Sequence, residues 1–309
     1  MKYWVFILIS SFLFSQRIPT YEVLSNKLDF EGTIHRIMKF PSKYVQVRTV
    51  DVWLPEGYSN TKKYEVLYMH DGQMLFDGKT TWNKQEWGVD ETISELTLNQ
   101  QINEVIVVAI WNIPEVRHLD YFPQKAMVYL TREEKKIVFD KANSLLLNFN
   151  NLSADNYLKF IVNEVKPYVD STYSVETTAS KTAIMGSSMG GLISMYALCE
   201  YPNIFGKAAC LSTHWIGLNN LEHNPIPEAI FSYLNRYLPQ SKTHKIYFDY
   251  GTETLDASYL PYQSKVSEIL RAKGYNSFSS ENKRFEAADH SENAWKNRLS
   301  VPLLFLFKK

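Results

Sequence analysis

The sequence is poor in cysteine and has no surplus of charge of either sign. Only Cys199 and Cys210 occur among 309 residues, too few for a disulfide framework, so we expect both to pack as small apolar side chains. The 33 lysine and arginine residues balance 33 aspartate and glutamate residues. The chain therefore lacks the excess of basic residues that is typical of proteins that bind nucleic acid. P-loop, G-x-G-x-x-G, H-E-x-x-H and C-x-x-C motifs are absent, so the sequence indicates no cofactor and no metal.

Long hydrophobic runs are also absent, with one exception near the N-terminus. Residues 3–14 are mostly apolar and follow Lys2, a pattern typical of a signal peptide and too short to span a bilayer comfortably. Because Ser15 is small enough to precede the cleaved bond, we predict a signal peptide at 1–15 and export to the periplasm or the medium; a retained anchor is the alternative. We expect residues 16–309 to form one domain without stable membrane association.

Hydrophobic periodicity predicts an α/β protein. Residues 32–38 and 45–53 alternate with period two, which indicates an antiparallel hairpin. From residue 64 onward, strand and helix patterns alternate, which is typical of a mostly parallel, twisted sheet with helices on both faces. The predicted strands lie at 64–69, 104–110, 181–186, 206–212, 244–250 and 282–287, and the predicted helices near 88–98, 154–170, 189–200, 226–238, 257–273 and 292–307.

A G-x-S-x-G motif stands between one predicted strand and the next helix. Residues 186–191 read Gly-Ser-Ser-Met-Gly-Gly. In the nucleophile elbow of α/β-hydrolases, such a strand–turn–helix unit holds a strained serine at the top of the sheet. Gly186 and Gly190 lack a Cβ, so neighbouring chain can approach closely. We therefore predict Ser188 as a nucleophile; a Ser/Gly-rich turn without chemistry is the alternative.

The elbow also predicts which residues complete a catalytic triad, because the acid and then the histidine must follow the serine. His290 alone among seven histidines follows both the serine and the candidate acids; a surface histidine is its alternative reading. Asp256 and Glu253 both follow the predicted strand at 244–250, at the sheet edge where α/β proteins place their sites. We favour Asp256 because its shorter side chain suits a carboxylate held by a turn. A helix-capping role for Asp256, with Glu253 as the acid, stays open.

An oxyanion hole needs two backbone N–H groups, one from the residue after the nucleophile and one from the loop after an early strand. The first is that of Met189. The second predicted donor is Gln73, which follows Gly72 just beyond the strand at 64–69. Such donors stabilise the negative charge that develops on the carbonyl oxygen in the transition state. An ordinary turn at this position is the alternative.

The stretch from residue 111 to residue 155 is the least regular part of the chain, and long loops in compact domains tend to be functional. We therefore expect Arg117 and Tyr121 in this stretch, together with Trp82 and Trp215 after other strands, to line the substrate site. Aromatic faces suit sugars and phenolic acyl groups, and the Arg117 guanidinium suits a carboxylate. Ordinary core packing is the alternative for each of these residues.

Three segments resemble one known family. The motif around Ser188, the stretch Leu-Tyr-Met-His-Asp-Gly-Gln at 67–73 and the ending His-Ser-Glu-Asn-Ala-Trp at 290–295 are similar to those of the Putative esterase family. This branch of the α/β-hydrolases includes esterase D, enterochelin esterases, feruloyl and acetyl-xylan esterases and mycolyltransferases. The resemblance runs from about residue 32 to the C-terminus. It implies an α/β-hydrolase fold without a lid domain and a serine esterase without a metal.

The sequence thus favours a serine carboxylesterase that hydrolyses a soluble ester, such as an acyl-sugar, a feruloyl-sugar or a siderophore-type ester. Two alternatives remain. An acyltransferase would use the same triad and acyl-enzyme, with an alcohol replacing water. A non-catalytic carbohydrate-binding protein would share the fold alone.

Overall fold

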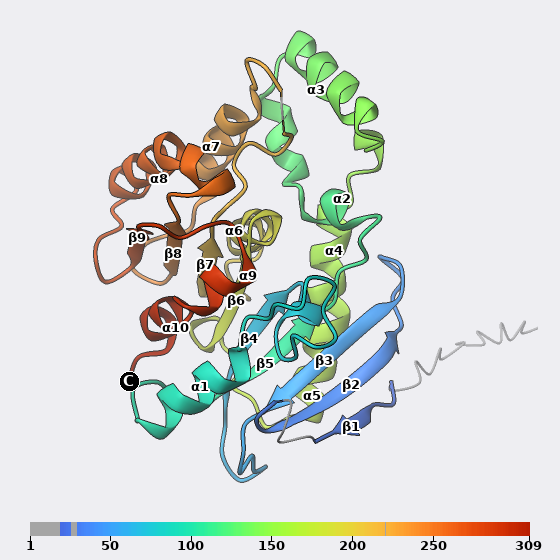
Figure 1. Ribbon diagram of the computed structural model, residues 1–309, viewed down its shortest axis with the longest axis vertical. Helices are drawn as coiled ribbons and strands as arrows, with labels where there is room; N and C mark the ends of the chain where they lie inside the picture. The colour runs from blue at the N-terminus through green and yellow to red at the C-terminus, as the bar shows by residue number, and fades with distance from the viewer. Residues whose placement is uncertain (1–18, 26–29, 220) are drawn as a thin grey trace, which may run out of the picture.

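The computed structural model describes residues 19–25, 30–219 and 221–309. The signal peptide predicted at 1–15 lies outside these residues. They form a nine-stranded sheet with the order β1-β2-β3-β5-β4-β6-β7-β8-β9 (Figure 1). The strands are β1 (Glu22–Leu24), β2 (Thr33–Phe40), β3 (Arg48–Leu54), β4 (Glu65–His70), β5 (Val105–Ile110), β6 (Thr182–Ser187), β7 (Lys207–Leu211), β8 (Lys245–Tyr250) and β9 (Ser280–Arg284).

The strand pairing confirms the predicted α/β-hydrolase arrangement. β2 and β3 form the predicted antiparallel hairpin, with Ile34 opposite Trp53, and β3 joins β5 antiparallel. All pairings from β5 through β4 to β9 are parallel. The three-residue strand β1, which the sequence did not predict, pairs antiparallel with the outer edge of β2.

Helices cover both faces of this sheet, and the central strands β4, β5 and β6 are therefore buried along their whole length. In β4, Val66 and Tyr68 point into one core while Leu67 and Met69 point into the other. The helices are α1 (Val89–Leu98), α2 (Arg117–Tyr121), α3 (Arg132–Ser144), α4 (Ala154–Phe160), α5 (Lys166–Thr172), α6 (Met189–Glu200), α7 (Ile226–Tyr237), α8 (Leu260–Ala272), α9 (Glu292–Lys296) and α10 (Ser300–Phe307). Residues of α1, α9 and α10 pack in one core, and residues of α4 to α8 pack in the other (Figure 1).

Several helices differ in detail from the prediction. The helix predicted at 154–170 is interrupted by a π turn at Ile161–Val165, and the helix predicted at 292–307 is divided into α9 and α10. The stretch 111–155 is more regular than predicted, because it contains α2 and α3. Thr131 begins α3 with a capping box: its hydroxyl accepts from the N–H of Glu134, whose carboxylate accepts from the N–H of Thr131.

The two cysteines pack as the sequence predicted. Cys199 and Cys210 are buried and unpaired, as predicted.

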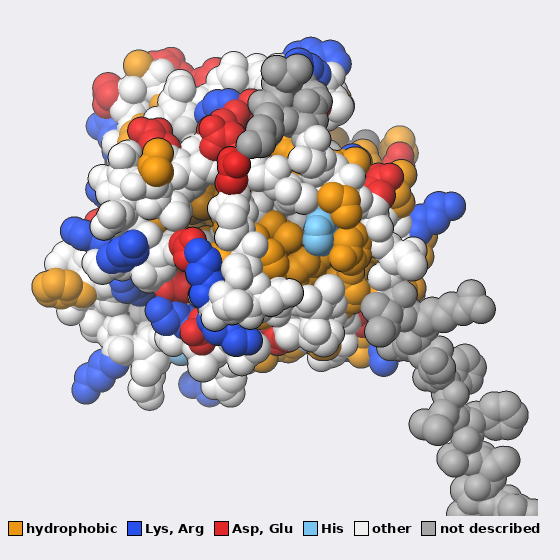
Figure 2. Space-filling model, turned by 90° about the horizontal axis from the view of Figure 1, so that it is seen from below, with side chains coloured by type: hydrophobic (Ala, Val, Ile, Leu, Met, Phe, Trp, Pro, Cys, Tyr) orange, Lys and Arg blue, Asp and Glu red, His pale blue; other side chains and the backbone are white. Residues whose placement is uncertain are grey.

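None of the helices in the described part of the chain combines the length and the hydropathy of a bilayer-crossing segment. On the face seen in Figure 2, lysine and arginine side chains are interspersed with carboxylates around a central group of hydrophobic side chains. This face therefore presents no continuous charge of one sign.

Candidate active site

The serine of the G-x-S-x-G motif lies on a strained turn between β6 and α6. Ser188 has φ 57° and ψ −123°, a conformation that a residue with a side chain adopts only when its surroundings impose it. A Cβ on Gly186 would lie 2.8 Å from the carbonyl carbon of Gly190, so the turn closes only with glycine there. Ser187 is buried, whereas Ser188 is partly exposed. The turn therefore presents Ser188 at the carboxyl edge of the sheet.

His290 and Asp256 meet at the same edge, on the loops after β9 and β8. Nδ1 of His290 lies 2.5 Å from Oδ1 of Asp256, whose side chain is fully buried. The backbone N–H of Gly251 donates to the other Asp256 oxygen at 2.6 Å. Glu253, on the turn before Asp256, is exposed to solvent. Of the two candidate acids, the structure brings Asp256 and not Glu253 to the histidine.

A group of buried polar side chains lies beneath Asp256. The hydroxyl of Ser212 donates to Oδ2 of Asp256 at 2.5 Å. The same oxygen of Ser212 accepts from Nε1 of Trp295 at 3.0 Å and from Arg298 at 2.8 Å. Arg298 also pairs with the buried carboxylate of Asp249 at 3.1 Å. These contacts fix the carboxylate and keep a compensating positive charge in the protein interior.

Ser188 and His290 line one cavity of about 800 Å³. Three indole rings are part of its lining. The ring centroids of Trp87 and Trp295 lie 5.4 Å apart, and those of Trp295 and His290 lie 5.1 Å apart with nearly perpendicular planes. Trp82 also lines the cavity, and 84% of its surface is exposed. The cavity can therefore hold an organic ester next to the serine and the histidine.

The two predicted oxyanion donors lie in the first turns of helical segments. Met189 is the first residue of α6, and Gln73 lies in the 3₁₀ turn Gly72–Met74 that follows β4. N–H groups in the first turn of a helix lack partners within that helix and can therefore bind an anion. A Cβ on Gly72 would lie 2.7 Å from the carbonyl carbon of Ala109, so glycine lets this turn approach β5 closely.

Arg117 reaches the cavity, but it already has a carboxylate partner. Its guanidinium makes two hydrogen bonds to Asp71, at 2.7 and 2.8 Å, and Asn112 donates to the same carboxylate at 2.7 Å. Burial alone would raise the pKa of Asp71, but Arg117 outweighs it and holds that pKa below its ordinary value. Asp71 has φ 57° in the turn that carries Gln73. Arg117 therefore braces the predicted oxyanion turn.

The structure corrects the predicted roles of two aromatic residues. Tyr121 is fully buried: its hydroxyl accepts from the backbone N–H of Asp71 at 3.3 Å and its ring lies 5.1 Å from the Arg117 guanidinium. Trp215 is also fully buried, against Phe231 and Phe248. Both rings therefore pack in the core and do not line the cavity.

Several side chains in or behind the site were not assigned a role from the sequence. They include Asp71, Asn112, Ser212, Glu292, Trp295 and Arg298. Ser212 comes directly after β7, and Asp71 directly after β4, so the rule that sites gather at carboxyl ends of parallel strands would have found both. No local pattern marks Arg298, because it reaches Ser212 across 86 residues.

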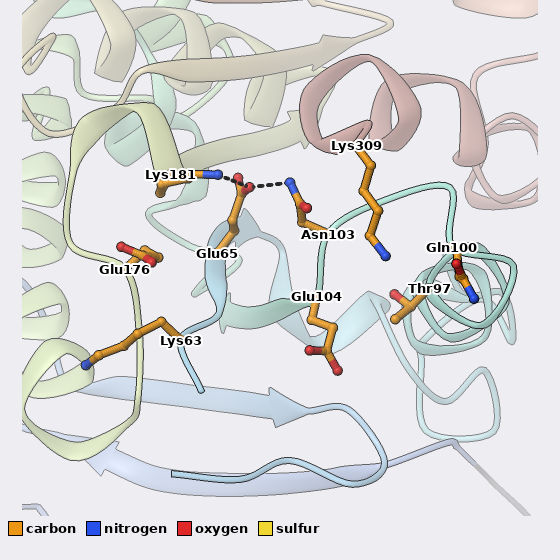
Figure 3. A pocket seen from close by; sticks show the side chains of 9 residues that line it. All are labelled: Lys63, Glu65, Thr97, Gln100, Asn103, Glu104, Glu176, Lys181 and Lys309. Atoms are coloured by element: carbon orange, nitrogen blue, oxygen red, sulfur yellow. Dashed lines mark hydrogen bonds and ion pairs between the residues drawn. The ribbon is translucent and has the colours of Figure 1, made fainter. Parts of the chain in front are cut away.

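A second cavity, of about 470 Å³, lies at the opposite edge of the sheet (Figure 3). Its central side chain is Glu65, which is 4% exposed and accepts from Lys181 and Asn103 at 2.8 Å and from Lys207 at 2.6 Å. These contacts tie the start of β4 to the segments that begin β5, β6 and β7. The charge of Glu65 is thus compensated within the protein, which indicates a structural role.

No group of three or more histidine, cysteine or carboxylate side chains suited to a metal ion occurs among the residues that the structure describes. The sheet order, the strained serine and the histidine–carboxylate pair together define an α/β-hydrolase. The family model described as "Putative esterase" matches residues 43–306, and the chain belongs to that family.

Two relatives are uncharacterized proteins of Bacillus subtilis (strain 168). YbbA is 26% identical over 170 residues, which cover 54% of this chain and 58% of YbbA. YjcH is 23% identical over 176 residues, which cover 57% of this chain and 60% of YjcH. The matches therefore span about three fifths of the length of these relatives.

Solved structures share the fold at low sequence identity. A ferulic acid esterase has a TM-score of 0.61 at 17% identity, covering 90% of this chain and 98% of that one. An IroE-like serine hydrolase from Shewanella oneidensis has a TM-score of 0.62 at 18% identity, covering 87% and 79%. The enterobactin esterase FES from Shigella flexneri, solved with a benzoyl-glycine ligand, has a TM-score of 0.60 at 15% identity, covering 94% and 61%.

Proposed function

We propose that the protein is a serine carboxylesterase that acts on a soluble ester through Ser188, His290 and Asp256. The observation that carries this proposal is the 2.5 Å contact between Nδ1 of His290 and the buried carboxylate of Asp256. His290 lines the same cavity as Ser188, whose backbone is strained. Family membership supports the same reaction class.

The hydrogen bond to Asp256 gives each nitrogen of His290 a separate role. Nδ1 carries the proton donated to the carboxylate, so Nε2 is the nitrogen that accepts the proton of the Ser188 hydroxyl. The serine oxygen then bonds to the ester carbonyl carbon, and the N–H groups of Met189 and Gln73 stabilise the charge on the carbonyl oxygen. The imidazolium returns its proton to the departing alcohol. Water attacks the acyl-enzyme by the same steps and releases the acid.

Two features of the site support an aromatic or sugar-bearing substrate. Three indole rings are part of the cavity lining, and one of them, Trp82, is largely exposed. The names of two similar structures, a ferulic acid esterase and an enterobactin esterase, suggest the same range of acyl and alcohol groups. We include feruloyl-sugars, acyl-sugars and siderophore-type esters in the proposed substrate class.

A panel of esters tests the reaction and the substrate class together. We expect hydrolysis of 4-nitrophenyl acetate and faster hydrolysis of at least one sugar or phenolic ester. Product analysis with an added alcohol separates the hydrolase from an acyltransferase, because a transferase would form the new ester in preference to the free acid. Turnover of no ester by a folded protein would favour the non-catalytic alternative.

We also propose that the protein acts outside the cytoplasm after removal of residues 1–15. The apolar run at 3–14 and the small Ser15 support this proposal. The N-terminal sequence of the mature protein tests it: Gln16 is the expected first residue, and an intact N-terminus would contradict it.

A further inference from the structure

The charged side chains that line the catalytic cavity do not balance one another. Asp71 and Arg117 form the bidentate pair described above, and His290 must be neutral to accept a proton. Glu292 adds a further carboxylate, and its Oε2 accepts from the uncharged amide of Asn83 at 2.8 Å. The cavity therefore carries one net negative charge when its histidine is ready for catalysis.

The two lysines that lie close in sequence to Glu292 and to Asn83 have other partners. Lys296, one turn further along α9, pairs with Glu86 at 2.8 Å and with Glu91 at 3.8 Å. Lys84, beside Asn83 in the sequence, donates to the backbone carbonyl of Lys79 at 2.7 Å. Neither ammonium group is the hydrogen-bond partner of the Glu292 carboxylate.

An exposed indole lines the same cavity as this carboxylate. Trp82 precedes Asn83, the residue that binds Glu292, and 84% of its surface is exposed. The face of an indole attracts cations more strongly than that of the other aromatic side chains. A carboxylate and an indole face lining the same cavity are a combination that binds ammonium groups.

The loop that carries Trp82 is held against the start of α9 before any ligand binds. The amide of Asn83 bonds Glu292, while its carbonyl oxygen accepts from the N–H of Gln85 at 3.1 Å. The side chain of Gln85 in turn accepts from the N–H of Asn293 at 3.3 Å. This preorganisation reduces the conformational entropy that a ligand would otherwise cost.

We propose that Trp82, Asn83 and Glu292 form a subsite for a positively charged group of the ester substrate, an amine or a quaternary ammonium. The inference rests on the proposed esterase function, because the charge preference is read from hydrolysis. A cationic group gains attraction from the carboxylate and the indole, whereas an anionic group meets repulsion from Glu292.

Two pairs of esters with matched shapes test the subsite. Acetylcholine and 3,3-dimethylbutyl acetate differ in the charge of the alcohol. The 4-nitrophenyl esters of 4-(trimethylammonio)butanoate and 5,5-dimethylhexanoate differ in the charge of the acyl group. We expect about a tenfold higher kcat/KM for the cationic member of at least one pair, declining as salt rises from about 0.02 to about 0.5 M.

Glu292→Gln should reduce the ratio of kcat/KM between the cationic and the neutral ester to about twofold or less. Trp82→Ala should divide the same ratio by about three. Glu253→Gln is the matched control, because Glu253 is exposed outside the cavity lining; the preference should persist there. Equal rates within both pairs, or an unchanged preference in Glu292→Gln, would overturn the subsite and leave the esterase standing. Hydrolysis of none of the four esters, together with no labelling by a neutral fluorophosphonate, would overturn the proposed function and the subsite with it.

Discussion

Ser212 is the residue whose replacement tests the hydrogen bonds behind Asp256, the proposed catalytic acid. Its hydroxyl donates to Asp256 at 2.5 Å and accepts from Trp295 at 3.0 Å and from Arg298 at 2.8 Å. Removing the oxygen loses two hydrogen bonds with charged groups, each worth about 1.5–3 kcal/mol, and leaves a buried indole N–H without its partner. Because such terms overlap, we expect Ser212→Ala to lower the free energy of unfolding by about 3–5 kcal/mol.

The backbone of Ser212 provides an internal comparison. Its φ is 42°, in the left-handed region, where glycine is not strained. Ser212→Gly loses the same hydroxyl but relieves about 1 kcal/mol of backbone strain. The glycine variant should therefore be more stable than the alanine variant, and both less stable than the wild type.

Urea unfolding followed by tryptophan fluorescence measures these differences, and initial rates of ester hydrolysis measure the effect on the site. We expect kcat to fall by about tenfold in both variants, because the carboxylate that orients His290 loses one of its donors. An alanine variant within about 0.5 kcal/mol of the wild type would refute the reasoning. So would an alanine variant more stable than the glycine variant.

The remaining predictions concern the proposed triad acid and the buried titratable groups. Asp256→Asn should lower activity by about 10³–10⁴ because the imidazole loses its orienting charge, whereas Glu253→Gln should stay within about tenfold; the reverse ranking in kcat/KM would reverse the assignment. Burial lowers the pKa of three histidines to about 3 or 4 (His70, His118 and His214). Each binds its proton more weakly in the folded chain than in the unfolded chain. The free energy of unfolding should therefore keep this contribution above about pH 6.5 and fall by about 2 kcal/mol per histidine by pH 5. Urea unfolding at the two pH values measures it, and an equal free energy of unfolding at both would contradict the prediction. Burial raises the pKa of both cysteine thiols, so both should resist a disulfide reagent in the native protein and react after unfolding; rapid labelling of the native protein would be inconsistent with their burial.

The sequence predicted those parts of the fold that depend on local pattern. The period-two stretches became β2 and β3, and the fully apolar run at 105–110 became a strand covered on both faces. The G-x-S-x-G motif located the strained turn, because glycine spacing and close chain approach are encoded over five residues. Chain order then located His290 and Asp256, which the structure joins by a hydrogen bond.

The parts that sequence missed depend on contacts between distant segments. Whether an aromatic residue lines a cavity or fills the core is decided by how its loop folds, so Tyr121 and Trp215 could not be separated from Trp82 by composition. Arg117 was expected to hold a substrate carboxylate, but Asp71, 46 residues away, is its partner in the structure. The α3 helix was missed for a different reason: its capping box at Thr131 and Glu134 was present in the sequence but was not used.

Labelling with a fluorophosphonate, followed by peptide mapping, tests the central claim most directly. The probe bonds to a serine oxygen only where a neighbouring base activates it. The account predicts a single adduct on Ser188, no adduct in Ser188→Ala and a retained adduct in Ser187→Ala. An adduct on another serine, or no adduct on the folded wild-type protein, would contradict it.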